Sequence, residues 1–369
     1  MNETKKKVLF VTDNPLVRAG VQAVIMDIVR NISPEYQFDI LLTVDGDGYY
    51  DSEFESFGGK IFRMSTKIVF GPKLDHHLRG PVVYKNVLKT LRQNGPYEAI
   101  HCHNEFEAAY CLMAAKKAGV KVRVVHTHTM TNLLNTVSKI YYGILSRLIE
   151  KSATHKLGCS EQACEGFYND QNETKAMNNS YDEGKFYFEK YPEEALDSPR
   201  LLQIGSFSNR KNQIFSIDVI AEIKKEYPNV KFDMVGFDIG NTIDKIKSKI
   251  IDLGLEDNVT IYPSDADSTL LLSKSSGSLI PSKSEAFGIV AIEAQAMGVK
   301  CYASDALPPS TNCGGCEYLP LSVGAQVWAK KIISDFKATG GKHEKYDCSA
   351  FSSKNVANEY RKIYGGIKL

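Results

Sequence analysis

The chain alternates short apolar runs of strand length with segments of helical period along almost its whole length. The first run covers residues 8–11, polar residues 12–14 follow it at once, and a helical pattern then covers 21–32. Such alternation predicts a parallel sheet, because parallel neighbours need a crossover connection that is usually a helix. We therefore expect an α/β fold built from doubly wound parallel sheets.

The alternation occurs as two series. For the first series we expect strands over 7–12, 38–44, 59–63, 99–103, 122–127 and 155–159, with helices over 21–32, 107–118 and 138–152. For the second we expect strands over 200–205, 231–236, 259–262, 277–281 and 300–304, with helices over 213–226, 241–253, 267–274, 290–297 and 323–337. A last helix is expected over 354–364.

The length of 369 residues exceeds what one hydrophobic core usually organises, so two domains are expected. Residues 191–199 lose periodicity and contain two prolines, which is typical of a linker. We place the first domain at 1–190 and the second at 200–349, with a C-terminal helical segment at 350–369 that packs back onto the first. Net charge agrees with this division, since residues 1–160 carry +6 and the rest −5.

Composition excludes several classes of protein. A net charge of +1 argues against the coating of nucleic acid, and no run reaches the roughly 20 apolar residues of a spanning helix. The N-terminus lacks the apolar segment of a secretory signal, so we expect a cytoplasmic protein. Its eight cysteines are then expected to be reduced thiols.

The most informative segment is residues 281–298, where an expected strand leads through a turn into a helix that starts near Gly288. Unpaired backbone N–H groups at such a helix start can bind a diphosphate. Glu285 lies in the turn, beside the reacting end of a ligand, and Glu293 lies about two turns into the helix, where it can accept hydrogen bonds from a ribose diol. The alternative is an ordinary joint with one capping and one solvated glutamate.

A second candidate site follows the expected strand 200–205. Gly205 allows the backbone to pass close to a ligand, and the adjacent Arg210 and Lys211 can neutralise a diphosphate leaving group. A basic pair at a helix N-terminus opposes the helix dipole, so an anion is expected beside it. The alternative is an exposed basic turn.

These motifs resemble those of the retaining glycosyltransferases of family 4. The resemblance rests on Gly205 through Asn212, followed about seventy residues later by Pro-Ser-x-x-Glu-x-Phe-Gly-x-x-x-x-Glu-Ala at 281–294. The sequence of residues 292–305 is similar to that of family members from bacterial capsule and exopolysaccharide gene clusters. The resemblance implies the GT-B fold, which consists of two facing Rossmann-like domains with a cleft between them. It also implies metal-independent transfer of a hexose or N-acetylhexosamine from a nucleotide-sugar, with retention of configuration.

Carried over residue by residue, the resemblance assigns roles in the second domain. Arg210 and Lys211 would stabilise the leaving diphosphate, Glu285 would contact the donor sugar and Glu293 the ribose. The backbone positions that would bind the donor are Gly205, Phe287, Gly288 and Ile289. In the first domain only Gly20 remains of a pair of glycines that many members have after strand one, so backbone approach to the phosphate rests on Gly20.

Two His-x-His pairs, His101 with His103 and His126 with His128, end expected strands of the first domain. With a period of two, both members of a pair point to one face, which would suit a metal, and Glu105 and Glu107 lie nearby in sequence. We expect no metal, because Arg210 and Lys211 supply the positive charge that the reaction needs. The resemblance assigns His128 to the donor sugar. Core packing is the alternative for His101 and His126.

Two further segments have competing interpretations. Residues 313–316 read Cys-Gly-Gly-Cys, but no second such motif completes a zinc ribbon, so a glycine-rich turn is favoured. The helix expected at 138–152 is amphipathic and basic, and either packs on the core or contacts anionic lipid peripherally at the inner face of the cell membrane.

The function that we predict is a glycosyltransferase without a cofactor, acting in cell-surface polysaccharide synthesis. Its expected donor is a nucleotide-sugar, specifically a UDP-sugar, and its acceptor is a glycan or lipid-linked saccharide; no nucleic acid is expected to bind. One alternative is a non-catalytic partner subunit of a transferase, although such a subunit would be expected to lose Glu285, Arg210 or Lys211. The other is a sugar-nucleotide 2-epimerase of the same fold, for which no additional acid and base carboxylates are identified.

Overall fold

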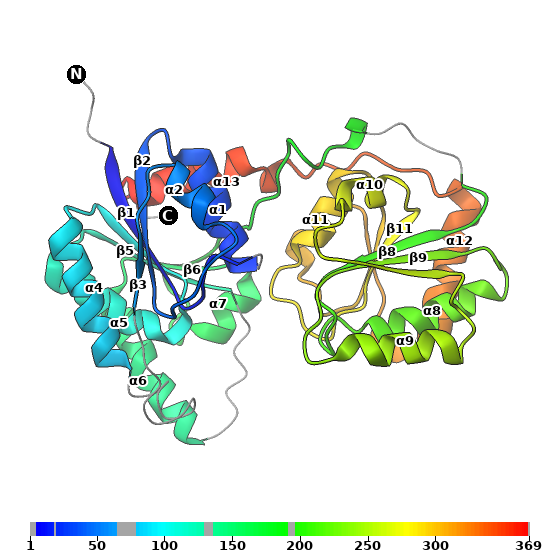
Figure 1. Ribbon diagram of the computed structural model, residues 1–369, viewed down its shortest axis with the longest axis horizontal. Coiled ribbons are helices and arrows are strands. Elements are labelled where there is room, and N and C mark those ends of the chain that lie inside the picture. The colour runs from blue at the N-terminus through cyan, green and yellow to red at the C-terminus, as the bar shows by residue number, and fades with distance from the viewer. Residues whose placement is uncertain (1–4, 18–19, 65–78, 129–135, 191–195, 368–369) are drawn as a thin grey trace. The chain divides into compact units, whose positions relative to one another are not determined.

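A computed structural model of the chain describes residues 5–17, 20–64, 79–128, 136–190 and 196–367 (Figure 1). It divides into two compact units. The first comprises residues 1–180 together with 353–369, and the second comprises 181–352. Each unit is described by itself.

The first unit contains a seven-stranded parallel sheet in the order β3-β2-β1-β4-β5-β6-β7. The strands are β1 (Lys6–Thr12), β2 (Tyr36–Leu42), β3 (Ile61–Arg63), β4 (Ala99–Cys102), β5 (Val122–Thr127), β6 (His155–Gly158) and β7 (Thr174–Ala176). The α-helices are α1 (Gly20–Ile32), α2 (Asp51–Ser56), α4 (Gly80–Asn94), α5 (Ala108–Ala118), α6 (Thr136–Ser152), α7 (Glu161–Phe167) and α13 (Ser353–Tyr364).

Both faces of this sheet are covered, which explains the unbroken apolar run in β1. Val8 and Phe10 pack in one core with α1 and α13, whereas Leu9 and Val11 pack in the other core with α4, α5 and α6. All four side chains are fully buried. A parallel strand that is buried on both sides has no reason to alternate polar and apolar residues.

The C-terminal helix α13 belongs to the first unit and packs against α1. Ser353 Oγ donates to Asp27 Oδ1 at 2.7 Å at its start, and the Arg361 guanidinium donates to the Glu35 carboxylate at 2.8 Å near its end. Tyr364 is fully buried among the residues of this core. The last residues of the chain thus complete the core of the first unit.

The second unit contains a six-stranded parallel sheet in the order β10-β9-β8-β11-β12-β13. The strands are β8 (Arg200–Ile204), β9 (Lys231–Val235), β10 (Val259–Tyr262), β11 (Gly277–Ile280), β12 (Cys301–Ala303) and β13 (Cys316–Tyr318). The α-helices are α8 (Gln213–Lys224), α9 (Thr242–Asp252), α10 (Ser268–Ser273), α11 (Ile289–Ala296) and α12 (Ala325–Thr339).

The prediction of two doubly wound parallel-sheet domains is confirmed. Helices α2, α4 and α7 and strands β7 and β13 were not predicted from the sequence. The second unit begins at Tyr181, whose N–H donates to Phe351 O at 3.0 Å, and Phe188 lies against Gly298. Residues 181–190, which we expected in the first domain, therefore lie with the second unit. Of the expected linker, residues 191–195 are outside the described residues.

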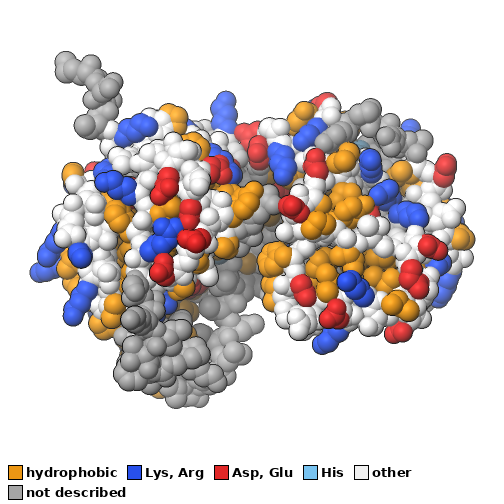
Figure 2. Space-filling view, in the orientation of Figure 1, with side chains coloured by type: hydrophobic (Ala, Val, Ile, Leu, Met, Phe, Trp, Pro, Cys, Tyr) orange, Lys and Arg blue, Asp and Glu red, His pale blue; other side chains and the backbone are white. Residues whose placement is uncertain are grey.

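Among the described helices, none is both long enough and apolar enough to cross a bilayer. On the face drawn in Figure 2, basic and acidic side chains of the described residues are interspersed, with hydrophobic side chains between them.

Candidate active site

The candidate residues of the second unit gather where its strand order reverses direction. From β8 the chain proceeds outward through β9 and β10, and it then returns to the other side of β8 with β11. Loops at the carboxyl ends of two such central strands leave the sheet in opposite directions, which opens a crevice for ligands. Gly205 follows β8 and Pro281 follows β11, so both predicted motifs lie at this point.

Two glycines bring the backbone loops close together at this edge. Gly205 has a φ of 147°, and a Cβ at this position would lie 3.3 Å from Lys211 Cε. Gly236, which follows β9, lies so near that its own Cβ would be 2.1 Å from Gly205 O. A side chain at Gly236 would therefore force the loop after β8 to move. Gly236 was not predicted as part of the site, although a glycine at the end of an expected strand is a recognisable signal.

The loop from β8 to α8 is joined to the loop from β11 to α11 by hydrogen bonds. Lys283 N–H donates to Arg210 O at 2.8 Å, and Lys283 Nζ donates to Asn209 Oδ1 at 2.7 Å. Asn212 Nδ2 donates to Pro281 O at 3.1 Å. These contacts fix the two motifs relative to each other although about seventy residues separate them in the chain.

Glu285 is where the two motifs meet. Its carboxylate is buried and lies 2.5 Å from Lys211 Nζ and 3.4 Å from an Arg210 guanidinium nitrogen. Ser282 Oγ donates to the same carboxylate at 3.2 Å. The expected anion beside the basic pair is therefore a carboxylate of the protein itself, while the Arg210 side chain remains half exposed.

Helix α11 begins directly after this carboxylate. Its N-cap is Gly288, with a φ of 90°, and no side chain among the described residues caps the helix start. Phe287 is buried, and its ring packs edge-to-face on Phe351 at 6.1 Å between centroids. Ile289 is the first helical residue, and Ala291 N–H donates to Gly288 O at 2.9 Å, which leaves the N–H groups that precede Ala291 to face an anion.

Glu293 lies on α11, one helical turn after Ile289, and is half buried. Burial raises the pKa of Glu293 to about 7, and Asp182 raises it further, whereas Lys185 lowers it. Asp182 and Lys185 belong to the segment that precedes the expected linker. The charge on this carboxylate therefore changes near neutral pH.

In the first unit, Gly20 is the first residue of α1, and it is exposed. A Cβ at Gly20 would meet none of the described residues within 4 Å, so they leave room for a ligand at this backbone position. Arg18 and Ala19, which precede it in the expected loop, lie outside the described residues.

His128 follows β5 and bonds to a neighbouring histidine. Its Nε2 lies 2.8 Å from His103 Nδ1, and its backbone N–H donates to Glu105 Oε1 at 3.3 Å. Desolvation lowers the pKa of His128 to about 3, so the ring is neutral. Glu105 also accepts from Thr127 Oγ1 at 3.0 Å, and it adopts a φ of 50°.

The other carboxylate that we considered beside the histidines, Glu107, bonds elsewhere. It forms an ion pair with Arg79, whose guanidinium also donates to Thr43 Oγ1 at 2.8 Å. Burial raises the pKa of nearby Asp13, with a further contribution from Glu107. This polar cluster was missed, because Arg79 lies far from Asp13 and Glu107 in sequence.

The Cys-Gly-Gly-Cys segment forms a turn, as expected, and leads into β13. Gln295 on α11 is fully buried, and its Oε1 accepts hydrogen bonds from the N–H groups of Cys313 and Gly315 at 2.7 and 3.0 Å. None of the eight cysteines forms a disulfide, and six of them are buried.

Residues 188–311 match the family model described as "Glycosyl transferases group 1". This segment contains all the candidate residues of the second unit. The putative glycosyltransferase EpsF of Bacillus subtilis (strain 168) is 26% identical over 362 residues, covering 93% of this chain and 91% of that protein. The capsular polysaccharide biosynthesis glycosyltransferase CapH of Staphylococcus aureus is 24% identical over 284 residues, covering 75% of each chain.

Among solved structures, Anabaena Alr3699/HepE in complex with UDP and glucose superposes with a TM-score of 0.75. The two chains are 18% identical, and the superposition covers 98% of this chain and 100% of the other. The parallel-sheet topology and this likeness establish the GT-B fold. Together, the fold, the matched segment and the sequence relatives support a glycosyltransferase of the GT-B type.

Proposed function

We propose that the protein is a retaining, metal-independent glycosyltransferase that moves a hexose or N-acetylhexosamine from a UDP-sugar to a glycan or lipid-linked saccharide. The observation that carries the proposal is the ion pair between Lys211 and Glu285, held by interlocked loops at the carboxyl ends of β8 and β11. A relative named for capsular polysaccharide biosynthesis supports the polysaccharide acceptor. The uridine base is supported by a structural neighbour whose complex contains UDP and glucose.

The charge balance of the site suits a diphosphate. Glu285 has one negative charge and contacts two cationic side chains, Arg210 and Lys211. An arriving diphosphate adds negative charge beside this trio, while the half-exposed guanidinium of Arg210 is accessible to it. The start of α11 adds N–H donors and the positive end of a helix dipole.

In the proposed reaction, the bond between the anomeric carbon and the phosphate oxygen breaks while the acceptor hydroxyl forms a new bond on the same face. The departing diphosphate oxygen accepts the proton of that hydroxyl. Arg210, Lys211 and the α11 N–H groups stabilise the charge that develops on the diphosphate. Glu285 orients Lys211 and contacts the donor sugar, Glu293 accepts from the ribose diol, and His128 contacts the sugar.

For helix α6 we propose peripheral contact with the membrane. This helix buries Leu145 and Ile149, whereas Ile140 and Ile144 are 64% and 53% exposed. Arg147 is also exposed on α6. Vesicle flotation with anionic lipid should recover the wild-type chain and recover much less of an Ile144→Ser variant. Equal recovery of the two proteins would contradict the assignment.

A ligand screen tests the main proposal. Thermal unfolding of the purified protein is measured with UDP, GDP, ADP, TDP and their common sugar conjugates, each with and without EDTA. We expect UDP to raise the melting temperature selectively and EDTA to leave that shift unchanged. The protein should then transfer the sugar of a UDP-sugar to a saccharide acceptor and release UDP, with the new linkage retaining the anomeric configuration.

Other outcomes would overturn the proposal. If no nucleotide raises the melting temperature, a non-catalytic partner subunit would be favoured. If EDTA abolishes the rise in melting temperature that UDP causes, metal independence would be contradicted. Release of UDP with the formation of a 2-epimeric sugar would point to an epimerase.

A further inference from the structure

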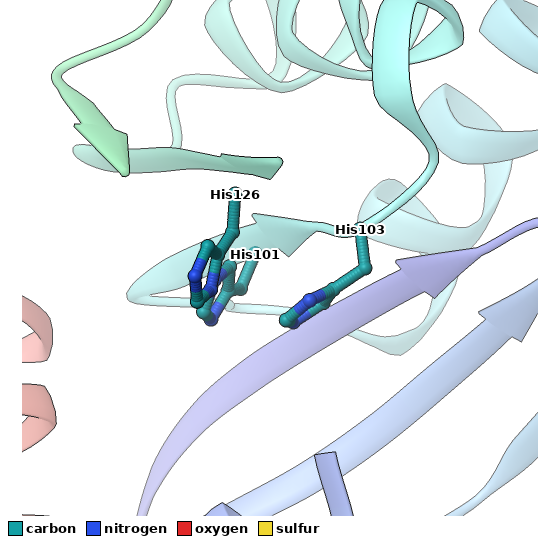
Figure 3. A group of neighbouring side chains, drawn as sticks. All are labelled: His101, His103 and His126. Atoms are coloured by element: carbon teal, nitrogen blue, oxygen red, sulfur yellow. The ribbon is translucent and has the colours of Figure 1, made fainter. Parts of the chain in front are cut away.

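The described part of the first unit contains a buried cluster of histidines that the proposed transfer does not use. His101 lies on β4, His103 directly follows β4, and His126 lies on β5 (Figure 3). The rings of His101 and His126 are stacked at 5.5 Å, and that of His103 lies 4.2 Å from His101. One ring nitrogen of each residue lies within 4.8 Å of the others.

The three side chains leave ring nitrogens without hydrogen-bond partners among the described residues. These atoms are Nε2 of His101, Nε2 of His103 and both ring nitrogens of His126. The residues are at most 2% exposed, so bulk water does not satisfy the nitrogens. Burying several polar atoms unpaired is costly, and each such group in a native protein needs an explanation.

The existing hydrogen bonds orient two of the rings as metal ligands. His101 Nδ1 lies 2.8 Å from the Tyr364 hydroxyl, and His103 Nδ1 lies 2.8 Å from His128 Nε2. If each Nδ1 carries the proton and donates it to these partners, each Nε2 presents a lone pair to the centre of the cluster. Metal-binding histidines usually donate their second N–H in this way.

We propose that His101, His103 and His126 bind a zinc-type divalent cation. Three imidazoles with an open fourth position form a donor set that zinc accepts, and no carboxylate is required. A zinc-to-nitrogen distance of about 2.0–2.1 Å needs nitrogens closer together than 4.8 Å, so the rings close slightly on binding. The Tyr360 hydroxyl is also buried without a described partner, and the Tyr360 ring lies 5.8 Å from that of His101 between centroids.

The three histidines belong to the first unit, whereas Arg210, Lys211 and Glu285 belong to the second. The cation would also fix the tautomer of His103 and so make His128 Nε2 a hydrogen-bond acceptor. This inference revises our expectation of no metal at the paired histidines. It does not depend on the proposed transfer, because it concerns zinc binding alone.

Zinc binding is tested on the full chain without a histidine tag. We expect one zinc per chain by elemental analysis after dialysis, and a melting temperature that rises with zinc concentration and falls on chelation. Cobalt in place of zinc should give the visible absorption of a tetrahedral site without thiolate-to-cobalt charge transfer. A thiolate-to-cobalt band would show that the metal binds to cysteines. If the protein retains no metal, the histidines are a neutral, hydrated stack. Either result overturns the proposal.

Variants locate the site. His126→Ala should lower zinc affinity by at least about 100-fold, and Tyr364→Phe, which removes only the partner of His101, by about 10-fold. His155→Gln is the matched control, because His155 is also a buried strand histidine but both its nitrogens are paired, with Thr154 Oγ1 and Ile367 O. Equal affinity in His126→Ala and wild type would overturn the proposal. If His126→Ala does not fold, the wild-type cobalt spectrum and Tyr364→Phe still decide.

Discussion

The carboxyl edges of the two sheets use opposite electrostatic arrangements. At the ends of β8 and β11 the buried Glu285 is neutralised by Lys211 and Arg210. At the ends of β4 and β5 the buried groups are uncharged imidazoles, and burial holds the pKa values of His101 and His103 well below their usual range. The first arrangement is a charge network that an anion can enter. The second is a set of unpaired lone pairs that attracts a cation.

A functional site can therefore be recognised either by paired charges or by buried polar atoms that lack hydrogen-bond partners. Lys211 and Glu285 satisfy each other, so their function is indicated by their place in the loops that lead into α8 and α11 rather than by an orphaned atom. His126 bonds to nothing among the described residues through either nitrogen, so the deficit itself is the indication.

Replacing Glu285 with glutamine should have the largest effect. The substitution keeps the shape but removes the charge that pairs with Lys211 and the contact that we propose with the donor sugar, so kcat should fall by about 100- to 1,000-fold. Glu222→Gln is the matched control, because Glu222 forms a surface pair with Lys225. Initial rates with a UDP-sugar, together with circular dichroism, check the prediction. Near-normal turnover of a folded Glu285→Gln protein would remove this residue from the mechanism.

Lys211→Ala should act mainly on nucleotide binding. Loss of a charged contact to the diphosphate should weaken UDP affinity by about 10- to 100-fold, measured by calorimetry. Lys225→Ala, which removes an exposed lysine of the same unit, should bind UDP like the wild type. An unchanged affinity in Lys211→Ala would move the phosphate site away from the end of β8.

Alanine substitutions at a glycine of each unit should affect the stability of the protein differently. Gly288 has a φ of 90°, and a Cβ there would lie 2.3 Å from a methyl group of the fully buried Leu307. Gly288→Ala should therefore lower the free energy of unfolding by about 1–3 kcal/mol. Gly20→Ala should change it little, because a Cβ at Gly20 meets nothing within 4 Å. Denaturant unfolding compares the two variants, and equal losses would contradict the distinction.

Most of the fold could be predicted from sequence, because periodicity is a local property. The strand at 122–127 was predicted to the residue, and most other predicted elements differ at their ends by one or two residues. The missed strands β7 and β13 have only three residues each, too few to show a period. The amphipathic helix α4, which buries Val83, Val87 and Leu91, did show a period and was overlooked.

The two candidate sites differ in how far they could be predicted. The proximity of Glu285 to Lys211 followed from motif order, since both loops leave neighbouring strands at one edge. The common face of His101 and His103 followed from the strand period. The hydrogen-bond partner of His101 could not be predicted, because α13 brings Tyr364 there from the other end of the chain. Long-range packing of this kind leaves no local signal.

The charge network of the second unit should also respond to pH through Glu293, whose pKa is raised to about 7 by burial. If its carboxylate accepts from the ribose diol, affinity for a UDP-sugar should fall about tenfold between about pH 8 and about pH 6, as the ionised fraction falls. A UDP-sugar is the better probe because, unlike UDP, it has no phosphate ionisation near neutral pH. Glu293→Gln should give a flatter profile.

Folding stability should change in the opposite direction with pH. The folded-state pKa of about 7 lies above the reference value of 4.5, so the stabilisation from protonated Glu293 is fully present below about pH 4.5 and is lost as pH rises through about 7. Ligand affinity and stability of the free protein should thus diverge across this range in the wild type and not in Glu293→Gln. Parallel changes in both proteins would show that another group titrates, and Glu293 would then lose its assignment to the ribose.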